Sequence, residues 1–266
     1  MKKLYAMLAG ICLSATMASA QCYDVMKTPD VTYTPTDTFK MDIYTPIGAP
    51  AGARPLLLMA HGGSFSGGDK NEHTCSEIAR RFASRGYTTC SIQYRLEKNT
   101  TDLLDSGVAG AAVLRSVADM KAAIRFFKND AFHANVYNVD TNIVYVGGNS
   151  AGAITAVNLA YLRDTLSIRA NDFRIDTAIR NAGGLEGDRG YPGYSTVVQG
   201  ILNFAGGVKD TLWITAGGPK IFSAHGDADR TVPYNFDMVL RSLTGGILKT
   251  ITLCGSGAMK PRLDEL

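Results

Sequence analysis

The sequence of 266 residues predicts an α/β domain with a largely parallel β-sheet. Short apolar runs rich in β-branched residues alternate with longer segments of helical periodicity, which is typical of sheets whose parallel strands are joined by helices. The length suffices for one large domain with a full core. We see no internal repeat and no sign of a second domain, so we expect one domain over residues 21–266.

Three early strands are expected. Residues 39–44 alternate apolar and polar side chains and predict a half-buried edge strand. Residues 56–60 are a continuous apolar run that ends in a glycine-rich loop, and residues 88–92 predict the next strand. Between them, Thr74 and Glu77 have the spacing of a capping box and predict the start of a helix.

The second half of the chain continues the alternation. Residues 108–127 carry apolar side chains at steps of three and four and predict an amphipathic helix. Residues 163–195 are polar and glycine-rich, which favours an insertion lying over the edge of the sheet. Residues 197–204 and 220–224 predict two more strands.

A stretch in the middle of the chain holds the clearest catalytic candidate. The apolar run 143–146 suits a buried parallel strand, and residues 151–162 follow as a helix. Ser150 lies on the tight turn between them, and Gly148 and Gly152 flank it in the pattern G-x-S-x-G of a nucleophile elbow. The hydroxyl must project alone from a sharp turn for a general base to reach it, and side chains at the glycine positions would collide with that turn.

Two further segments stand where a serine hydrolase needs them. The H-G-G segment directly follows a predicted strand, so the N–H groups of Gly62 and Gly63, with that of Ala151, can form an oxyanion hole. The second segment, H-G-D-A-D-R-T-V-P, begins where the strand 220–224 ends. Asp229 within it can accept a hydrogen bond from a histidine and fix its tautomer.

These motifs resemble those of α/β-hydrolases of the secreted carboxylesterase and lipase-like kind. H-G-G-S-F resembles the family's H-G-G-x loop, G-N-S-A-G its elbow, and the third segment its H-G-x-x-D-x-x-V-P. The resemblance covers nearly all of the chain after residue 20 and implies a three-layer sandwich with a mostly parallel central sheet. It implies the nucleophile Ser150, the triad acid Asp229, and the oxyanion donors Gly62, Gly63 and Ala151.

One part of the triad departs from the family pattern. In this fold the order is Ser, then Asp or Glu, then His. All four histidines precede Asp229: His61, His73, His133 and His225. The end of the chain resembles the segment that leads to the family's last strand. We therefore expect a C-terminally truncated chain that lacks this strand and the triad histidine, and that has little or no turnover.

Two assignments have a rival. Asp227 is the other candidate acid, and the spacing to Val232 favours Asp229. His225 is near Asp229 in sequence, but a histidine at a strand end is more often structural than catalytic. Aromatic residues that could line an acyl or alcohol pocket, or simply pack in the core, are Phe65, Tyr191, Tyr194 and Trp213.

The first 20 residues predict a secretory signal peptide. They combine a basic start, an apolar segment and the small-residue site A-S-A, with cleavage after Ala20. A secreted or periplasmic location follows. Removing two lysines and no acid lowers the formal net charge from +3 to +1, and nothing suggests a nucleic-acid partner. No later segment approaches the roughly 18 apolar residues of a transmembrane helix.

Four cysteines remain after such cleavage: Cys22, Cys75, Cys90 and Cys254. In an oxidising compartment they allow one or two disulfides with three possible connectivities, and buried free thiols are an equal alternative.

The sequence thus predicts a serine carboxylic-ester hydrolase that acts through an acyl-enzyme on Ser150. We expect a small-molecule or glycan-linked ester as substrate, and no metal or organic cofactor is implied. A carbohydrate acetyl or feruloyl esterase, or a serine peptidase of the same fold, is an alternative, since the fold does not fix the substrate. A non-catalytic secreted binding module is another, because no histidine follows Asp229. Acyl and alcohol specificity and the oligomeric state stay open.

Overall fold

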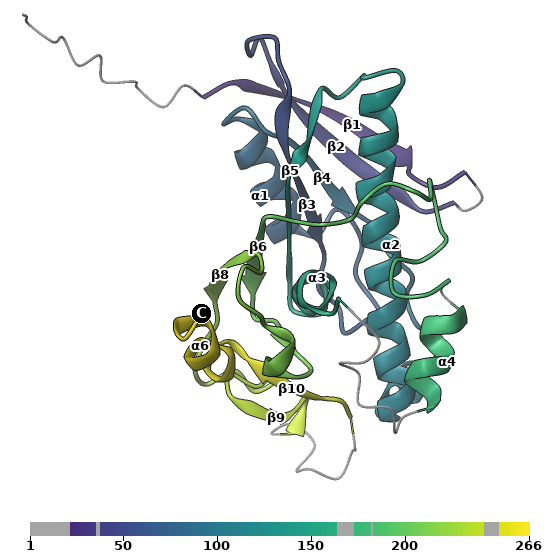
Figure 1. Ribbon diagram of the computed structural model, residues 1–266, viewed down its shortest axis with the longest axis vertical. Helices are drawn as coiled ribbons and strands as arrows, with labels where there is room; N and C mark the ends of the chain where they lie inside the picture. The colour runs from purple at the N-terminus through teal and green to yellow at the C-terminus, as the bar shows by residue number, and fades with distance from the viewer. Residues whose placement is uncertain (1–21, 36–37, 164–172, 182, 242–249) are drawn as a thin grey trace, which may run out of the picture.

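The computed structural model describes residues 22–35, 38–163, 173–181, 183–241 and 250–266 (Figure 1). The predicted signal peptide lies outside these residues. No helix among them is both long and apolar enough to cross a bilayer.

The main sheet has seven strands in the order β1-β2-β4-β3-β5-β6-β8. β1 and β2 pair antiparallel, as do β2 and β4, and all other neighbours are parallel. The predicted α/β class with a mostly parallel sheet is confirmed. The strands are β1 (Asp24–Thr32), β2 (Lys40–Ile47), β3 (Arg54–Ala60), β4 (Thr88–Ile92), β5 (Val139–Asn149), β6 (Gly200–Phe204) and β8 (Lys220–Ala224).

Helices cover both faces of the sheet and give three layers (Figure 1). Alternate residues of a strand point to opposite faces, so Leu57 and Met59 pack with α1 while Leu56 and Leu58 belong to the core beneath α2 and α3. The helices are α1 (His73–Ala83), α2 (Ser106–Phe132), α3 (Ala151–Tyr161), α4 (Phe173–Asn181) and α6 (Ser256–Asp264), with short 3-10 turns η1 (Thr100–Leu104) and η2 (Thr211–Trp213).

The prediction of an edge strand at residues 39–44 is wrong in its position. β1 pairs along the outer side of β2, so β2 lies inside the sheet and residues 41–44 are buried. β1 has the sequence D-V-M-K-T-P-D-V-T and is half exposed along its length. It lacks the apolar alternation by which a strand is recognised, so it could not be predicted from the sequence.

Buried Asp42 ties the outer strands together. Lys27 Nζ lies 2.7 Å from Oδ2 and Lys70 Nζ 2.6 Å from Oδ1, and the Asp42 side chain has no solvent exposure. Burial alone would raise the pKa of Asp42, but the hydrogen bonds from Lys27 and Lys70 outweigh it and hold that pKa below its usual 3.8. Asp42 is therefore ionised in the folded chain at neutral pH.

The capping box predicted for α1 is also wrong. Glu72 is the N-cap residue, and its carboxylate accepts from the N–H groups of Thr74 at 3.2 Å and Cys75 at 2.9 Å. Since the helix begins at His73, Glu77 lies beyond the first turn, and its carboxylate pairs with Arg80 at 2.7 Å instead of capping the helix.

The segment expected over the sheet's edge packs on α2 instead, in the part of it that the structure describes. α4 lies beside α2 (Figure 1). Lys121 donates to the carbonyl of Leu185 at 2.6 Å and to the carboxylate of Glu186 at 2.8 Å. Arg125 donates to the carbonyl of Glu186 at 2.6 Å. A buried cation without a hydrogen-bond acceptor is costly. Lys121 and Arg125 on α2 therefore keep the segment after α4, which supplies their acceptors, in contact with α2.

A second, three-stranded sheet was not expected. It consists of β7 (Gly207–Val208), β10 (Thr252–Gly255) and β9 (Phe236–Met238), in that order and antiparallel. α6 follows β10 directly and buries Met259. This sheet brings residues of the last thirty positions toward the end of β5, where Ser150 lies.

Cys75, Cys90 and Cys254 are buried thiols that form no disulfide. Of the two alternatives that the sequence left open, one or two disulfides or buried free thiols, the structure has the buried thiols at these three positions. Burial raises the pKa of Cys75 and Cys90 well above the ordinary thiol value.

Candidate active site

Ser150 occupies a strained turn between β5 and α3, as the sequence predicts. Its φ of 51° and ψ of −116° are disfavoured for any residue with a side chain. The Ser150 N–H donates to the carbonyl of Phe204 on β6 at 2.8 Å, and its carbonyl accepts from Ile154 on α3 at 2.9 Å. The sheet and the helix thus hold the turn from both sides.

The glycines around Ser150 permit a contact that no other residue could make. A Cβ on Gly152 would lie 1.9 Å from the carbonyl oxygen of Ala60, at the end of β3. A Cβ on Gly148 would lie 2.3 Å from the carbonyl carbon of Gly152 and 2.6 Å from the same Ala60 oxygen. Backbone meets backbone here, so α3 approaches the sheet closely enough to project Ser150.

The glycine loop after β3 passes beside Ser150. A Cβ on Gly62 would lie 3.4 Å from the Cβ of Ser150. Gly63 has a φ of +119°, and a Cβ there would lie 2.1 Å from the carbonyl oxygen of Gly67. Within the described chain, the N–H groups of Gly62, Gly63 and Ala151 donate to no protein acceptor. They are available to an oxyanion beside Ser150.

His61 supports this loop from behind. Its ring stacks on Tyr94 with the centroids 4.3 Å apart, and the Tyr94 hydroxyl donates to the His61 carbonyl at 2.8 Å. Nδ1 lies 2.7 Å from the Gly62 carbonyl oxygen. Burial lowers the pKa of His61, which is fully enclosed, although the hydrogen bond to Gly62 acts in the opposite direction. His61 is therefore a neutral structural residue.

A cavity of about 210 Å³ lies against Ser150. Its wall is mainly apolar and includes Phe65, Leu103, Leu104, Ile154, Val239 and Ile251. Phe65 is the one predicted aromatic that lines it. Tyr191 lies near Phe126, Tyr194 stacks on Phe132, and Trp213 is buried in the core. The sequence did not reveal Val239 or Ile251 as lining residues, because the β9–β10 hairpin that carries them was not expected.

Asp229 lies after β8 and is hydrogen-bonded to two residues of the same site. Its Oδ1 accepts from the N–H groups of Thr231 at 2.8 Å and Val232 at 3.0 Å. Both of those residues line the cavity beside Ser150. No such pair of backbone hydrogen bonds reaches Asp227 in the described chain, so the geometry favours Asp229 as the acid.

No described histidine lines the cavity of Ser150. His225 comes closest to the acid, with Nε2 3.5 Å from Asp229 Oδ2, but its Nδ1 faces Ser256 Oγ at 3.1 Å. Among the described residues, the predicted nucleophile and oxyanion donors therefore lie together, and the predicted acid is hydrogen-bonded to residues of the same cavity, while no imidazole reaches Ser150. In the same residues no three His, Cys, Asp or Glu side chains gather into a metal-binding group.

A strained serine turn, free glycine N–H groups and a mostly parallel sheet define the α/β-hydrolase class of esterase folds. The family model described as BD-FAE, for bifunctional feruloyl and acetyl esterase, matches residues 41–183. This match covers more than half of the chain, and the chain belongs to the BD-FAE family. The matched residues include the oxyanion loop and the elbow, and end before Asp229.

Two curated relatives support this membership. Gut esterase 1 of Caenorhabditis elegans is 29% identical over 116 residues, which are 42% of this chain and 20% of the relative. Its Caenorhabditis briggsae counterpart is 30% identical over 105 residues, 40% of this chain and 18% of the relative. The match thus spans about a fifth of the length of these relatives.

Solved structures share the fold at low identity. Esterase 2 of Thermogutta terrifontis, phosphoramylated by tabun, superposes with a TM-score of 0.57 at 19% identity, over 90% of this chain and 79% of that one. A bifunctional GH43-CE protein of Bacteroides eggerthii gives 0.60 at 19% identity, over 92% of this chain and 34% of that one. The fold expected from the sequence is confirmed.

Proposed function

We propose that the protein is a serine carboxylesterase whose acyl-enzyme forms on Ser150. The observation that carries this proposal is the position of Ser150 on a strained turn, beside unpaired glycine N–H groups and an apolar cavity. Family membership and the esterase relatives support it.

The chemistry follows from the geometry. A general base takes the proton of Ser150 Oγ as the oxygen attacks the ester carbonyl. The N–H groups of Gly62 or Gly63 and of Ala151 bind the oxyanion, and the N-terminus of α3 adds a favourable dipole. The alcohol leaves with the proton, and water then releases the acid. The apolar cavity accepts the acyl group.

The base is the part that the described residues do not supply at Ser150. Asp229 accepts hydrogen bonds from Thr231 and Val232, which line the cavity, and would orient a histidine there. We therefore propose that the 266-residue chain hydrolyses esters slowly. Sites that have lost a triad member keep roughly 10³–10⁴-fold catalysis over water through the oxyanion hole and binding, and this sets the expected scale.

For the substrate we propose an acetyl or aromatic acyl ester on a carbohydrate, in line with the family name. The cavity wall supports the acyl side of this proposal, since Phe65 and Leu104 offer an apolar surface. A binding module that retains the fold is the second candidate, favoured by the absence of a histidine among the residues that line the cavity.

Imidazole rescue distinguishes the two candidates. We expect the chain to hydrolyse 4-nitrophenyl butyrate slowly, and added imidazole to raise the rate above that of Ser150→Ala in the same buffer. The rate with Ser150→Ala measures the direct reaction of imidazole with the ester, which is then subtracted. Equal rates for the two proteins at every imidazole concentration would refute the enzyme and leave the binding module.

We also propose that the protein is exported, from the basic and apolar character of residues 1–20. N-terminal sequencing of the protein recovered from its native host should begin at Gln21. A protein that retains Met1 would contradict export.

A further inference from the structure

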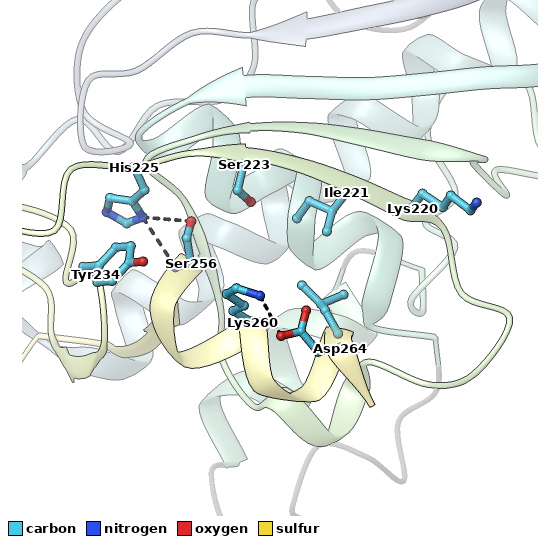
Figure 2. A pocket seen from close by; sticks show the side chains of 9 residues that line it. Lys220, Ile221, Ser223, His225, Tyr234, Ser256, Lys260 and Asp264 are labelled. Atoms are coloured by element: carbon cyan, nitrogen blue, oxygen red, sulfur yellow. Dashed lines mark hydrogen bonds and ion pairs between the residues drawn. The ribbon is translucent and has the colours of Figure 1, made fainter. Parts of the chain in front are cut away.

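A serine–histidine pair away from Ser150 lies in a groove between β8 and α6 (Figure 2). Ser256 is the first residue of α6, and its Oγ lies 3.1 Å from Nδ1 of His225, directly after β8. The groove has a volume of about 480 Å³. Figure 2 shows the pair at one end of the groove and Lys220 at the other. None of the residues that line it belongs to the cavity of Ser150.

The partners of His225 fix its tautomer. Nε2 lies 3.2 Å from the carbonyl oxygen of Val232 and 3.5 Å from Asp229 Oδ2, and both of these groups accept hydrogen bonds. Nε2 therefore carries the proton of the neutral ring. Nδ1 is left with a free lone pair, toward which both the hydroxyl and the backbone N–H of Ser256 are directed, the N–H from 3.5 Å (Figure 2).

The Ser256 hydroxyl therefore donates to His225. A second contact agrees with this direction, since Asn203 Nδ2 donates to Ser256 Oγ at 3.3 Å. A serine whose proton points at the lone pair of a neutral imidazole, with the far ring nitrogen anchored by acceptors, has the geometry of an activated nucleophile.

The surroundings favour charge on Ser256 and hold the imidazole still. The N-terminus of α6 directs its dipole toward Oγ and stabilises negative charge there. The side chain of His225 is fully buried, and the Tyr234 ring packs edge-on against it with the centroids 5.6 Å apart. Ser256 is half-buried and lines the groove, so its oxygen is open to a small molecule.

We propose that Ser256 is a second nucleophilic serine, with His225 as its base, and that it reacts with small carboxylic esters of polar alcohols. The polar side of the groove, with Tyr234 and Lys260, suits a polar alcohol. This proposal uses neither Ser150 nor its oxyanion donors. It shares only Asp229 with the function proposed above and does not rest on that function.

The reaction balances without a further reagent. As Ser256 Oγ bonds to the ester carbonyl carbon, its proton passes to His225 Nδ1. The bond from that carbon to the alcohol oxygen then breaks, and the alcohol takes the proton from Nδ1. A water molecule then attacks the acyl carbon, and its proton passes to Nδ1. The bond from that carbon to Ser256 Oγ breaks, Oγ takes the proton back from Nδ1, and the acid leaves.

A fluorophosphonate tests the proposal on the unaltered chain. Ser256 Oγ would bond to phosphorus, fluoride would leave, and the proton would pass through His225 to solvent. Peptide mapping after reaction in imidazole-free buffer should place the adduct on Ser256. His225→Gln should slow it by roughly 10²-fold or more, the usual share of a general base. Ser223→Ala is the matched control, because Ser223 lines the same groove and contacts Asn203 but no histidine.

Two results would overturn the proposal. One is a folded wild-type chain with no adduct on Ser256. The other is an adduct whose rate is the same in a folded His225→Gln variant, since the hydrogen bond would then merely dock α6. If that variant does not fold, Ser256→Ala and the wild-type peptide map still decide. An adduct on Ser150 alone would refute this proposal and support the esterase site. An adduct on Ser256 alone supports this proposal and leaves the Ser150 site untouched, because the test of Ser150 requires added imidazole.

Discussion

Replacing Ser150 by glycine should stabilise the fold relative to alanine, which reverses the usual order. Glycine in an ordinary position costs about 0.5–1 kcal/mol relative to alanine, because it loses more backbone freedom on folding. At a φ of 51° and ψ of −116°, however, alanine keeps the steric strain of a Cβ and glycine does not.

The expected difference in the free energy of unfolding between the two variants follows from these two opposing effects. Strained backbone conformations cost of order 1–3 kcal/mol each. Subtracting the glycine penalty leaves Ser150→Gly more stable than Ser150→Ala by about 1 kcal/mol, or roughly 2–4 °C in Tm for a chain of this size. Both variants lack the hydroxyl, so the comparison isolates the backbone.

Urea unfolding of the two variants measures this difference. Ala153→Gly is the matched control, since Ala153 lies in the regular part of α3 and is fully buried. That change should destabilise by about 1 kcal/mol or more. If Ser150→Gly is less stable than Ser150→Ala by a similar amount, Ser150 does not lie on a strained turn and the elbow geometry is refuted.

Three further outcomes are expected. Gly152→Ala should cost at least about 3 kcal/mol in urea unfolding, because its Cβ would lie 1.9 Å from a backbone oxygen, whereas Gly226→Ala, with nothing within 4 Å, should stay within about 0.5 kcal/mol. The lowered pKa of Asp42 contributes stability above pH 3.8 that is lost as the pH falls through its folded pKa, so stability measured between pH 6 and 2 should fall less in Asp42→Asn. Iodoacetamide should spare Cys75 and Cys90 until the chain unfolds, because both thiols are buried with raised pKa values. Alkylation of these two thiols at the same rate in the native and the unfolded chain would contradict this packing.

The sequence predicted those parts of the site that depend on short stretches of chain. β4 and β8 begin and end where expected. The elbow at Ser150 was predictable because Gly148 and Gly152 leave room for one kind of turn. Local sterics are enough for such features.

Features that depend on distant parts of the chain were not predictable. β1 gains its order from pairing with β2, and its own sequence has no strand pattern. Val239 and Ile251 reach the Ser150 cavity only because β9 pairs with β10. The contact of His225 with Ser256 joins residues 31 positions apart. Such contacts between distant residues depend on the packing of the whole fold and cannot be predicted from a short stretch of sequence.

The most direct test of the central claim is a peptide map of Ser150 after reaction with a fluorophosphonate in the presence of imidazole. Imidazole replaces the base that the described residues do not bring to Ser150. The Ser150 peptide should carry the phosphonate, at a rate that rises with imidazole and that falls when Gly62→Val crowds the oxyanion loop. A Ser150 peptide that stays unmodified in the folded chain, at imidazole concentrations that saturate the reaction of other serines, would contradict the assignment of Ser150 as the nucleophile.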